Sequence, residues 1–179
     1  MIVRVNDITD KVRSLAAVEA IDEHPILKAL QDEGECLFRS PLTVDVTVVR
    51  EYDHIRLEAD VTVVVALNCS RCLASYETTL KSNFTVFYSK STGSFVPDEE
   101  VELGERELVS AYYEGEEINV SPEIAEHVLI ELPLKPLCSE GCRGLCPSCG
   151  VDLNTTVCDC SDNRSGFAFS ALKNFKVER

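Results

Sequence analysis

The stretch Ile55-Arg-Leu-Glu-Ala-Asp-Val-Thr-Val-Val-Val-Ala-Leu67 decides the fold. It begins with alternating apolar and polar residues and ends in a continuous apolar run. Period-two alternation and β-branched side chains favour a strand. The same pattern occurs on both sides, over Leu42–Val49 and Tyr76–Tyr88. Three such strands in succession predict an antiparallel sheet or a small β-barrel.

Two shorter elements are expected before these strands. Ile2–Val5 is a candidate for a short strand. From about Asp10 to Ala20, the apolar residues lie broadly on one side of a helix, which predicts a helix there. These residues are Val12, Leu15, Ala16, Val18 and Ala20.

The pattern of strands stops in an acidic segment after Ser89. Asp98–Glu117 carries nine acidic residues and one basic residue, Arg106. This composition predicts a solvated, mobile loop, with a short pairing at Glu107–Tyr113. The alternative interpretation is a docking surface for a basic partner.

A helix is expected after this loop. Ser121 suits the N-cap, Pro122 suits the first helical position, and Pro133 ends the helix. Its predicted apolar stripe consists of Ile124, Val128, Leu129 and Leu132. A second, short amphipathic helix is expected over Phe167–Lys176 at the end of the chain.

The expected fold class is therefore α+β. It combines an antiparallel sheet or small β-barrel core, a few helices, and a small C-terminal Cys-rich metal-binding segment. We expect a core domain over residues 1–133, with an acidic loop near 90–117. Residues 134–179 would form a Cys-rich zinc-binding tail with the closing helix.

The bulk properties exclude several classes of protein. The chain has 179 residues and a net charge of −14, so the clustered basic residues of a broad nucleic-acid surface are missing. No stretch approaches the roughly 20 apolar residues of a membrane span. The first ten residues lack the layout of a signal peptide. We therefore expect an acidic, cytoplasmic protein with no membrane partner.

The cysteines point to a metal. Six of the nine cysteines lie between Cys138 and Cys160, around the sequence Cys146-Pro-Ser-Cys149-Gly150. In a turn of this kind both thiolates face one ion, and glycine relieves the strain of the turn. An odd number of cysteines and a reducing compartment argue against a disulfide framework. The sequence predicts one structural Zn²⁺.

The sequence leaves open which cysteines bind this ion. Cys146 and Cys149 are the first choice. The second pair is either Cys158 with Cys160, which we favour, or Cys138 with Cys142. All six could also share a larger arrangement.

A further pair, Cys69-Ser-Arg-Cys72, joins two predicted strands. A redox dithiol is expected at the N-terminus of a helix, where the dipole lowers a thiol pKa. The position between strands instead indicates a hairpin turn with a structural role. A contribution to a second metal site, together with thiols left over from the tail, is the remaining alternative.

No catalytic motif is recognisable in this sequence. The phosphate-binding, dinucleotide-binding and zinc-protease patterns are missing, and no nucleophile adjoins a base. We expect a protein that is not an enzyme and has no small-molecule substrate.

Several of these motifs together resemble the YceD family of large ribosomal RNA subunit accumulation proteins. The resemblance rests on three blocks and covers about Leu42 to the end. They are Cys69-Ser-Arg-Cys72-Leu73, Ile118-Asn-Val-Ser-Pro-Glu-Ile-Ala-Glu126, and Cys142-Arg-Gly-Leu-Cys146-Pro-Ser-Cys149-Gly-Val-Asp-Leu-Asn154 with Cys158-Asp-Cys160.

The resemblance implies a non-catalytic role in ribosome biogenesis, in accumulating large-subunit ribosomal RNA. Genes of the family commonly neighbour that of a small basic large-subunit ribosomal protein, so the implied partners are such a protein, a protein–RNA intermediate, or both. Some members lack the tail cysteines, which implies that zinc stabilises the fold. The alternatives are a direct RNA-binding protein that uses basic residues of 162–179, and a redox-sensing protein that uses Cys69 and Cys72.

Overall fold

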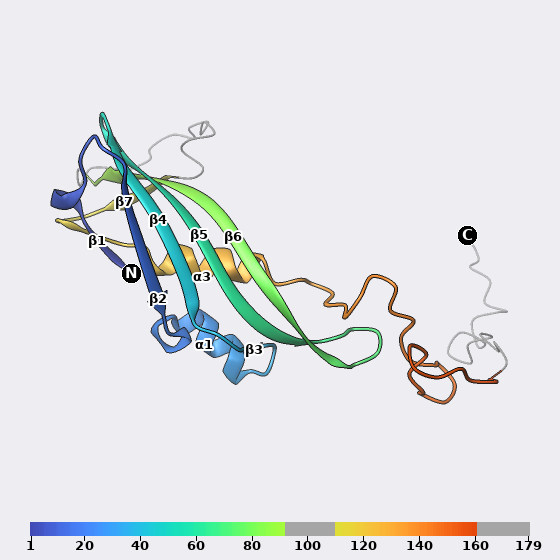
Figure 1. Ribbon diagram of the computed structural model, residues 1–179. Helices are drawn as coiled ribbons and strands as arrows, with labels where there is room; N and C mark the ends of the chain where they lie inside the picture. Colours follow the sequence, from blue (N-terminus) through green and yellow to red (C-terminus); the bar gives the residue numbers. More distant parts are fainter. Residues whose placement is uncertain (92–109, 161–179) are drawn as a thin grey trace, which may run out of the picture.

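The computed structural model describes residues 1–91 and 110–160. Its centre is a mixed sheet with the strand order β2-β4-β5-β6-β7, in which β3 also pairs with β5 (Figure 1). The strands are β2 (Arg13–Glu19), β3 (Leu37–Phe38), β4 (Leu42–Glu51), β5 (His54–Asn68), β6 (Ser75–Lys90) and β7 (Ser110–Tyr113). All pairs are antiparallel except β6 with β7. The described strands do not close into a barrel. Of the two predicted architectures, a sheet or a small β-barrel, the sheet is the one that forms.

Smaller elements complete the fold. A separate antiparallel ribbon pairs β1 (Ile2–Arg4) with β8 (Glu117–Asn119). Two 3-10 turns, Val5–Asp7 and Ile21–Glu23, flank β2. The helices are α1 (Pro25–Asp32) and α3 (Ser121–Ile130). In the described part of the chain, neither is long and apolar enough to cross a membrane.

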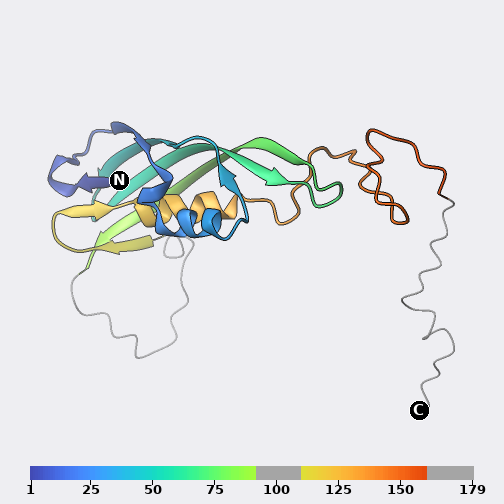
Figure 2. The same cartoon turned by 90° about the horizontal axis from the view of Figure 1, so that it is seen from below.

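The long strands β4, β5 and β6 have one covered and one open face. On the covered face, Val46 lies opposite Ala59, which lies opposite Phe84, and all three are buried. Helix α3 packs against this face and α1 packs against α3 (Figure 2). The core therefore lies between the sheet and the helices, and the period-two pattern of the sequence reports which residues enter it.

The predicted helix over Asp10–Ala20 is wrong, because this segment contains strand β2. β2 pairs along β4, with Leu15 opposite Val46. Val12 and Val18 are 65% and 69% exposed and only Leu15 of the predicted stripe packs against the core, so the five residues do not form one buried face. The backbone groups of the β4 edge outweigh the local spacing of apolar residues. The nearest helix is α1, which begins at Pro25, after this segment, and was not predicted from the sequence.

Helix α3 confirms the helix predicted between Ser121 and Pro133, with shifted ends. Val120 is the N-cap and Ser121 the first helical residue, and the side chain of Asn119 accepts a hydrogen bond from the Ser121 amide at 3.1 Å. The helix ends at Ile130, three residues before Pro133. Ile124 and Val128 are buried as predicted.

The two remaining members of the predicted stripe are less buried. Leu132 is partly buried against the core, whereas Leu129 is 37% exposed. Two further expectations lie outside the described residues: most of the acidic loop and the closing helix over Phe167–Lys176. Of the pairing expected at Glu107–Tyr113, strand β7 shows the described part.

Candidate functional site: two groups of four cysteines

The first group begins at the turn between β5 and β6. The turn follows Asn68, the last residue of β5, and its ends are joined by a hydrogen bond of 2.9 Å from the Cys69 amide to the Ala74 carbonyl. The predicted hairpin turn is thus confirmed. Leu73 has a positive φ of 62°, a conformation that is uncommon for a residue with a side chain. The turn places the Sγ atoms of its two cysteines within 4.8 Å of each other.

Two cysteines of the tail complete this group. The sulfur of Cys69 lies 3.7 Å from that of Cys142, and the sulfur of Cys72 lies 3.7 Å from that of Cys138. All four Sγ atoms lie within 4.8 Å of one another. We call Cys69, Cys72, Cys138 and Cys142 the hairpin group.

Backbone amides favour the thiolate form of Cys69, one member of this group. The Arg71 amide donates to the Cys69 sulfur at 3.4 Å. Hydrogen bonding from the backbone of Cys138 first, and from Cys72 and Arg71, lowers the pKa of Cys69 to about 6. Amide donors to sulfur stabilise the charged form, which is the form that binds metals.

Hydrogen bonds fasten the tail to the same turn. The Ser70 amide donates to the Pro136 carbonyl at 2.8 Å, and the Leu145 amide donates to the Arg71 carbonyl at 3.1 Å. The Arg71 guanidinium donates to the Cys142 carbonyl at 2.9 Å. The tail therefore meets the sheet at the tip of the β5–β6 hairpin, the end of the sheet toward which it runs in Figure 1.

The second group lies wholly within the tail. Its four Sγ atoms also lie within 4.8 Å of one another. We call Cys146, Cys149, Cys158 and Cys160 the tail group. Cys146 is buried, whereas Cys149 and Cys160 are exposed. This group is therefore more open to solvent than the hairpin group.

The tail group has the turn geometry that its sequence predicts. Hydrogen bonds from the backbones of Cys149 and Ser148 lower the pKa of Cys146 to about 6. Gly150 has a φ of +74°, and its amide donates to the Cys146 carbonyl at 2.8 Å. A side chain would be strained in this conformation, which explains the glycine.

Four cysteine sulfurs around one point suit a structural metal ion, which binds them as thiolates. Structural zinc is held by four ligands in a tetrahedron, and four cysteines are a common set. With all four positions supplied by the protein, such a site leaves none for a substrate. Each group can therefore hold a metal ion.

The structure divides the six tail cysteines between the two groups. Cys158 and Cys160 lie with Cys146 and Cys149, the pairing that the sequence favoured. Cys138 and Cys142 lie instead with the hairpin pair, so the alternative pairing and the arrangement of all six are not those of the structure. The sequence does carry one signal that Cys69 and Cys72 belong to a metal site: their Cys-x-x-Cys spacing is the same as that of Cys146 and Cys149. The number of ions and their identity stay predictions.

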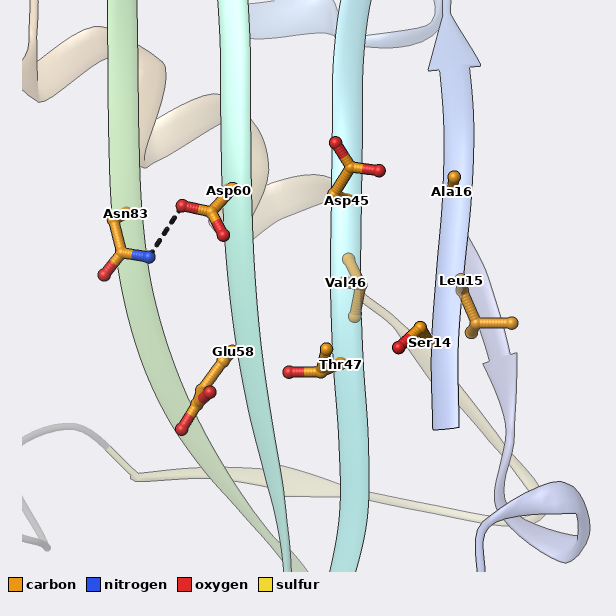
Figure 3. A pocket seen from close by; sticks show the side chains of 9 residues that line it. All are labelled: Ser14, Leu15, Ala16, Asp45, Val46, Thr47, Glu58, Asp60 and Asn83. Atoms are coloured by element: carbon orange, nitrogen blue, oxygen red, sulfur yellow. Dashed lines mark hydrogen bonds between the residues drawn. The ribbon is translucent and has the colours of Figure 1, made fainter. Parts of the chain in front are cut away.

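A second feature is the open face of the sheet. A concavity of about 420 Å³ lies over β2, β4, β5 and β6, and its acidic residues are Asp45, Glu58 and Asp60 (Figure 3). Asp45 and Asp60 are directly opposite each other on neighbouring strands. Asp60 accepts a hydrogen bond from Asn83 at 2.8 Å. We call these three acidic residues and their surroundings the acidic face.

The charges of the acidic face are only partly balanced. Arg56 forms an ion pair with Glu58. No cation pairs with Asp45 or Asp60 among the described residues. Like charges directly opposite each other in a sheet are destabilising. A partner that brings positive charge would relieve this repulsion.

Comparison with known proteins identifies relatives. Residues 57–176 match the model of the family described as large ribosomal RNA subunit accumulation protein YceD. The chain is 26% identical over 172 residues to the chloroplastic large ribosomal RNA subunit accumulation protein YCED homolog 1 of Arabidopsis thaliana, covering 85% of this chain and 54% of that protein. The homolog of the same name in Zea mays is 29% identical over 145 residues, covering 68% and 49%.

A bacterial relative has a sequence identity to this chain similar to that of the two plant proteins. An uncharacterized protein of Mycobacterium leprae is 29% identical over 118 residues, covering 64% of this chain and 50% of that protein. The chain thus spans about half the length of the curated relatives it matches. No solved structure matches the chain.

Proposed function

Because this chain belongs to the YceD family of large ribosomal RNA subunit accumulation proteins, we propose that it is a non-catalytic factor of ribosome biogenesis. It promotes the accumulation of large-subunit ribosomal RNA. It does so by binding a basic large-subunit ribosomal protein, free or already associated with RNA. The observation that carries the proposal is the family match over residues 57–176.

The acidic face supports a basic partner. Among the described residues, its concavity is lined by three acidic side chains, Asp45, Glu58 and Asp60, and by no basic one. The whole chain has a net charge of −14, so its long-range field attracts cations and repels RNA phosphates. A ribosomal protein held there would be shielded from nonspecific RNA until its proper site competes for it.

The tail has a structural part in this proposal. The tail group binds Zn²⁺, because four thiolates in a reducing compartment favour zinc. The ion orders a segment that is short and polar, since its binding free energy becomes folding free energy.

The test is a pull-down of the full chain from cells, with and without ribonuclease. The proposal predicts that a basic large-subunit ribosomal protein is recovered in both cases. Binding only to ribosomal RNA, lost with ribonuclease and with no affinity for any basic large-subunit protein, would overturn it in favour of direct RNA binding.

Matched variants sharpen this test. The double variant Asp45→Asn/Asp60→Asn removes two charges from the acidic face. Glu33→Gln/Glu35→Gln removes two charges from exposed positions at the end of α1. Only the first variant should reduce recovery of the partner. An equal reduction by both would assign the effect to net charge alone.

A further inference from the structure

We infer that the hairpin group is a second metal site, separate from the tail group, and that its ion fastens the tail to the end of the sheet. The chain then carries two metal ions with different tasks. The tail ion folds the tail, and the hairpin ion positions it.

Sulfur spacing is the first argument. Four thiolates about 2.3 Å from one ion in a tetrahedron lie about 3.8 Å from one another. Two of the six Sγ separations, Cys69 to Cys142 and Cys72 to Cys138, are both 3.7 Å, and all six lie within 4.8 Å. A disulfide would bring two sulfurs to about 2.05 Å. The hairpin group therefore has the spacing of a metal site.

Burial is the second argument. Cys69, Cys72 and Cys142 are 0%, 7% and 3% exposed and form a small cluster apart from the main core, whereas Cys138 at the edge of the group is exposed. Within the described part of the chain, three partly buried apolar side chains pack against this cluster: Tyr76, Leu137 and Leu145. So small an apolar cluster contributes little against the conformational entropy lost when the tail is ordered. A metal ion supplies the missing binding free energy.

The location of the group is the third argument. Two of its cysteines belong to the β5–β6 turn and two to the tail, 66 and 73 residues away in sequence. Hydrogen bonds join the segment 134–160 to this turn at Ser70 and Arg71, and the Leu137 backbone also bonds Tyr76 near the start of β6. Loss of the ion would therefore release the tail from the sheet.

Asn154 connects the two groups. It belongs to the loop between Cys149 and Cys158, yet its side-chain amide donates to the Cys142 sulfur at 3.4 Å. Its side-chain oxygen accepts from the Arg143 amide at 2.7 Å. Partners of this kind orient metal ligands. Folding of the tail group therefore completes the surroundings of the hairpin group.

The experiment is zinc analysis of the full chain purified without added metal. Four-cysteine sites predict about two equivalents in the wild type and about one in both Cys69→Ser/Cys72→Ser and Cys146→Ser/Cys149→Ser. Cys36→Ser is the matched control, since Cys36 is buried but belongs to neither group; it should retain both ions. A wild type with one equivalent that Cys69→Ser/Cys72→Ser leaves unchanged would overturn the inference, as would a disulfide within the hairpin group.

Tryptic cleavage after Arg71 gives a second readout. The Arg71 side chain is engaged by the tail at the Cys142 carbonyl. Cleavage should rise in Cys69→Ser/Cys72→Ser while circular dichroism retains the signal of the sheet. Unchanged protection of Arg71 in that variant would show that the ion does not fasten the tail.

Discussion

Gly144 lies against the turn between β5 and β6. It has a φ of +74°, and a Cβ added to it would lie 3.0 Å from the carbonyl oxygen of Arg71. Gly144→Ala should therefore loosen the tail from the hairpin, beyond the ~1–2 kcal/mol cost of the left-handed conformation. Faster amide exchange at Ser70, which donates to Pro136, would report this.

Gly150→Ala is the control for this prediction. Gly150 has the same φ of +74°, but nothing lies within 4 Å of its added Cβ. It shares the conformational cost without the clash. If both variants accelerate exchange at Ser70 equally, the close approach of Gly144 to Arg71 does not matter.

Asn154 allows a second prediction about a single residue. Asn154→Asp keeps the oxygen that accepts from Arg143 but replaces the donor to the Cys142 sulfur with a negative oxygen. The affinity of the hairpin group for zinc should fall by about 10- to 100-fold. Competition with a chelator measures the change. An affinity within about twofold of the wild type would contradict the role of Asn154, since loss of such a partner costs far more.

The residues also show how far the sequence predicts the site. Cys146-Pro-Ser-Cys149-Gly150 was readable because short spacing and a following glycine are local signals. The partnership of Cys69 with Cys142 was not, because it joins positions 73 residues apart. The tail follows α3, so this contact depends on how close the end of α3 lies to the tip of the β5–β6 hairpin. The whole fold sets that distance, and no local sequence pattern reports it.

The elements of the sheet should survive loss of the tail metal. Cys146→Ser is expected to disorder the tail while β4, β5 and β6 stay folded. The core of these strands is built from apolar residues of the covered face, and none of the tail-group cysteines belongs to it. Amide exchange should accelerate across residues 144–160 and stay slow at Val46 and Leu57. Global acceleration would mean that sheet and tail fold as one unit.

Strands with strong alternation were predictable, and weakly patterned elements were not. β4, β5 and β6 correspond to the three predicted runs to within a few residues. β2 was mistaken for a helix because its alternation is weak: its apolar Val18 is exposed and its Glu19 is buried. An edge strand depends more on its neighbour than on its own pattern.

On the scale of the whole molecule, charge should govern the encounter with a basic partner. Screening limits exposed charges to ~8 Å at physiological ionic strength, so binding should weaken steeply with salt. Asp45→Asn/Asp60→Asn should slow association more than it speeds dissociation, because steering charges act before contact. Stopped-flow kinetics at several salt concentrations would measure both rates. A change confined to dissociation would contradict steering.

The most direct test of the central claim is the ratio of large-subunit to small-subunit ribosomal RNA in cells that lack the protein. The account predicts that large-subunit RNA falls while small-subunit RNA is spared. The wild-type gene should restore the ratio, and Asp45→Asn/Asp60→Asn should restore it less well than Glu33→Gln/Glu35→Gln. An unchanged ratio, or an equal fall of both RNAs, would contradict a role in accumulating the large-subunit RNA.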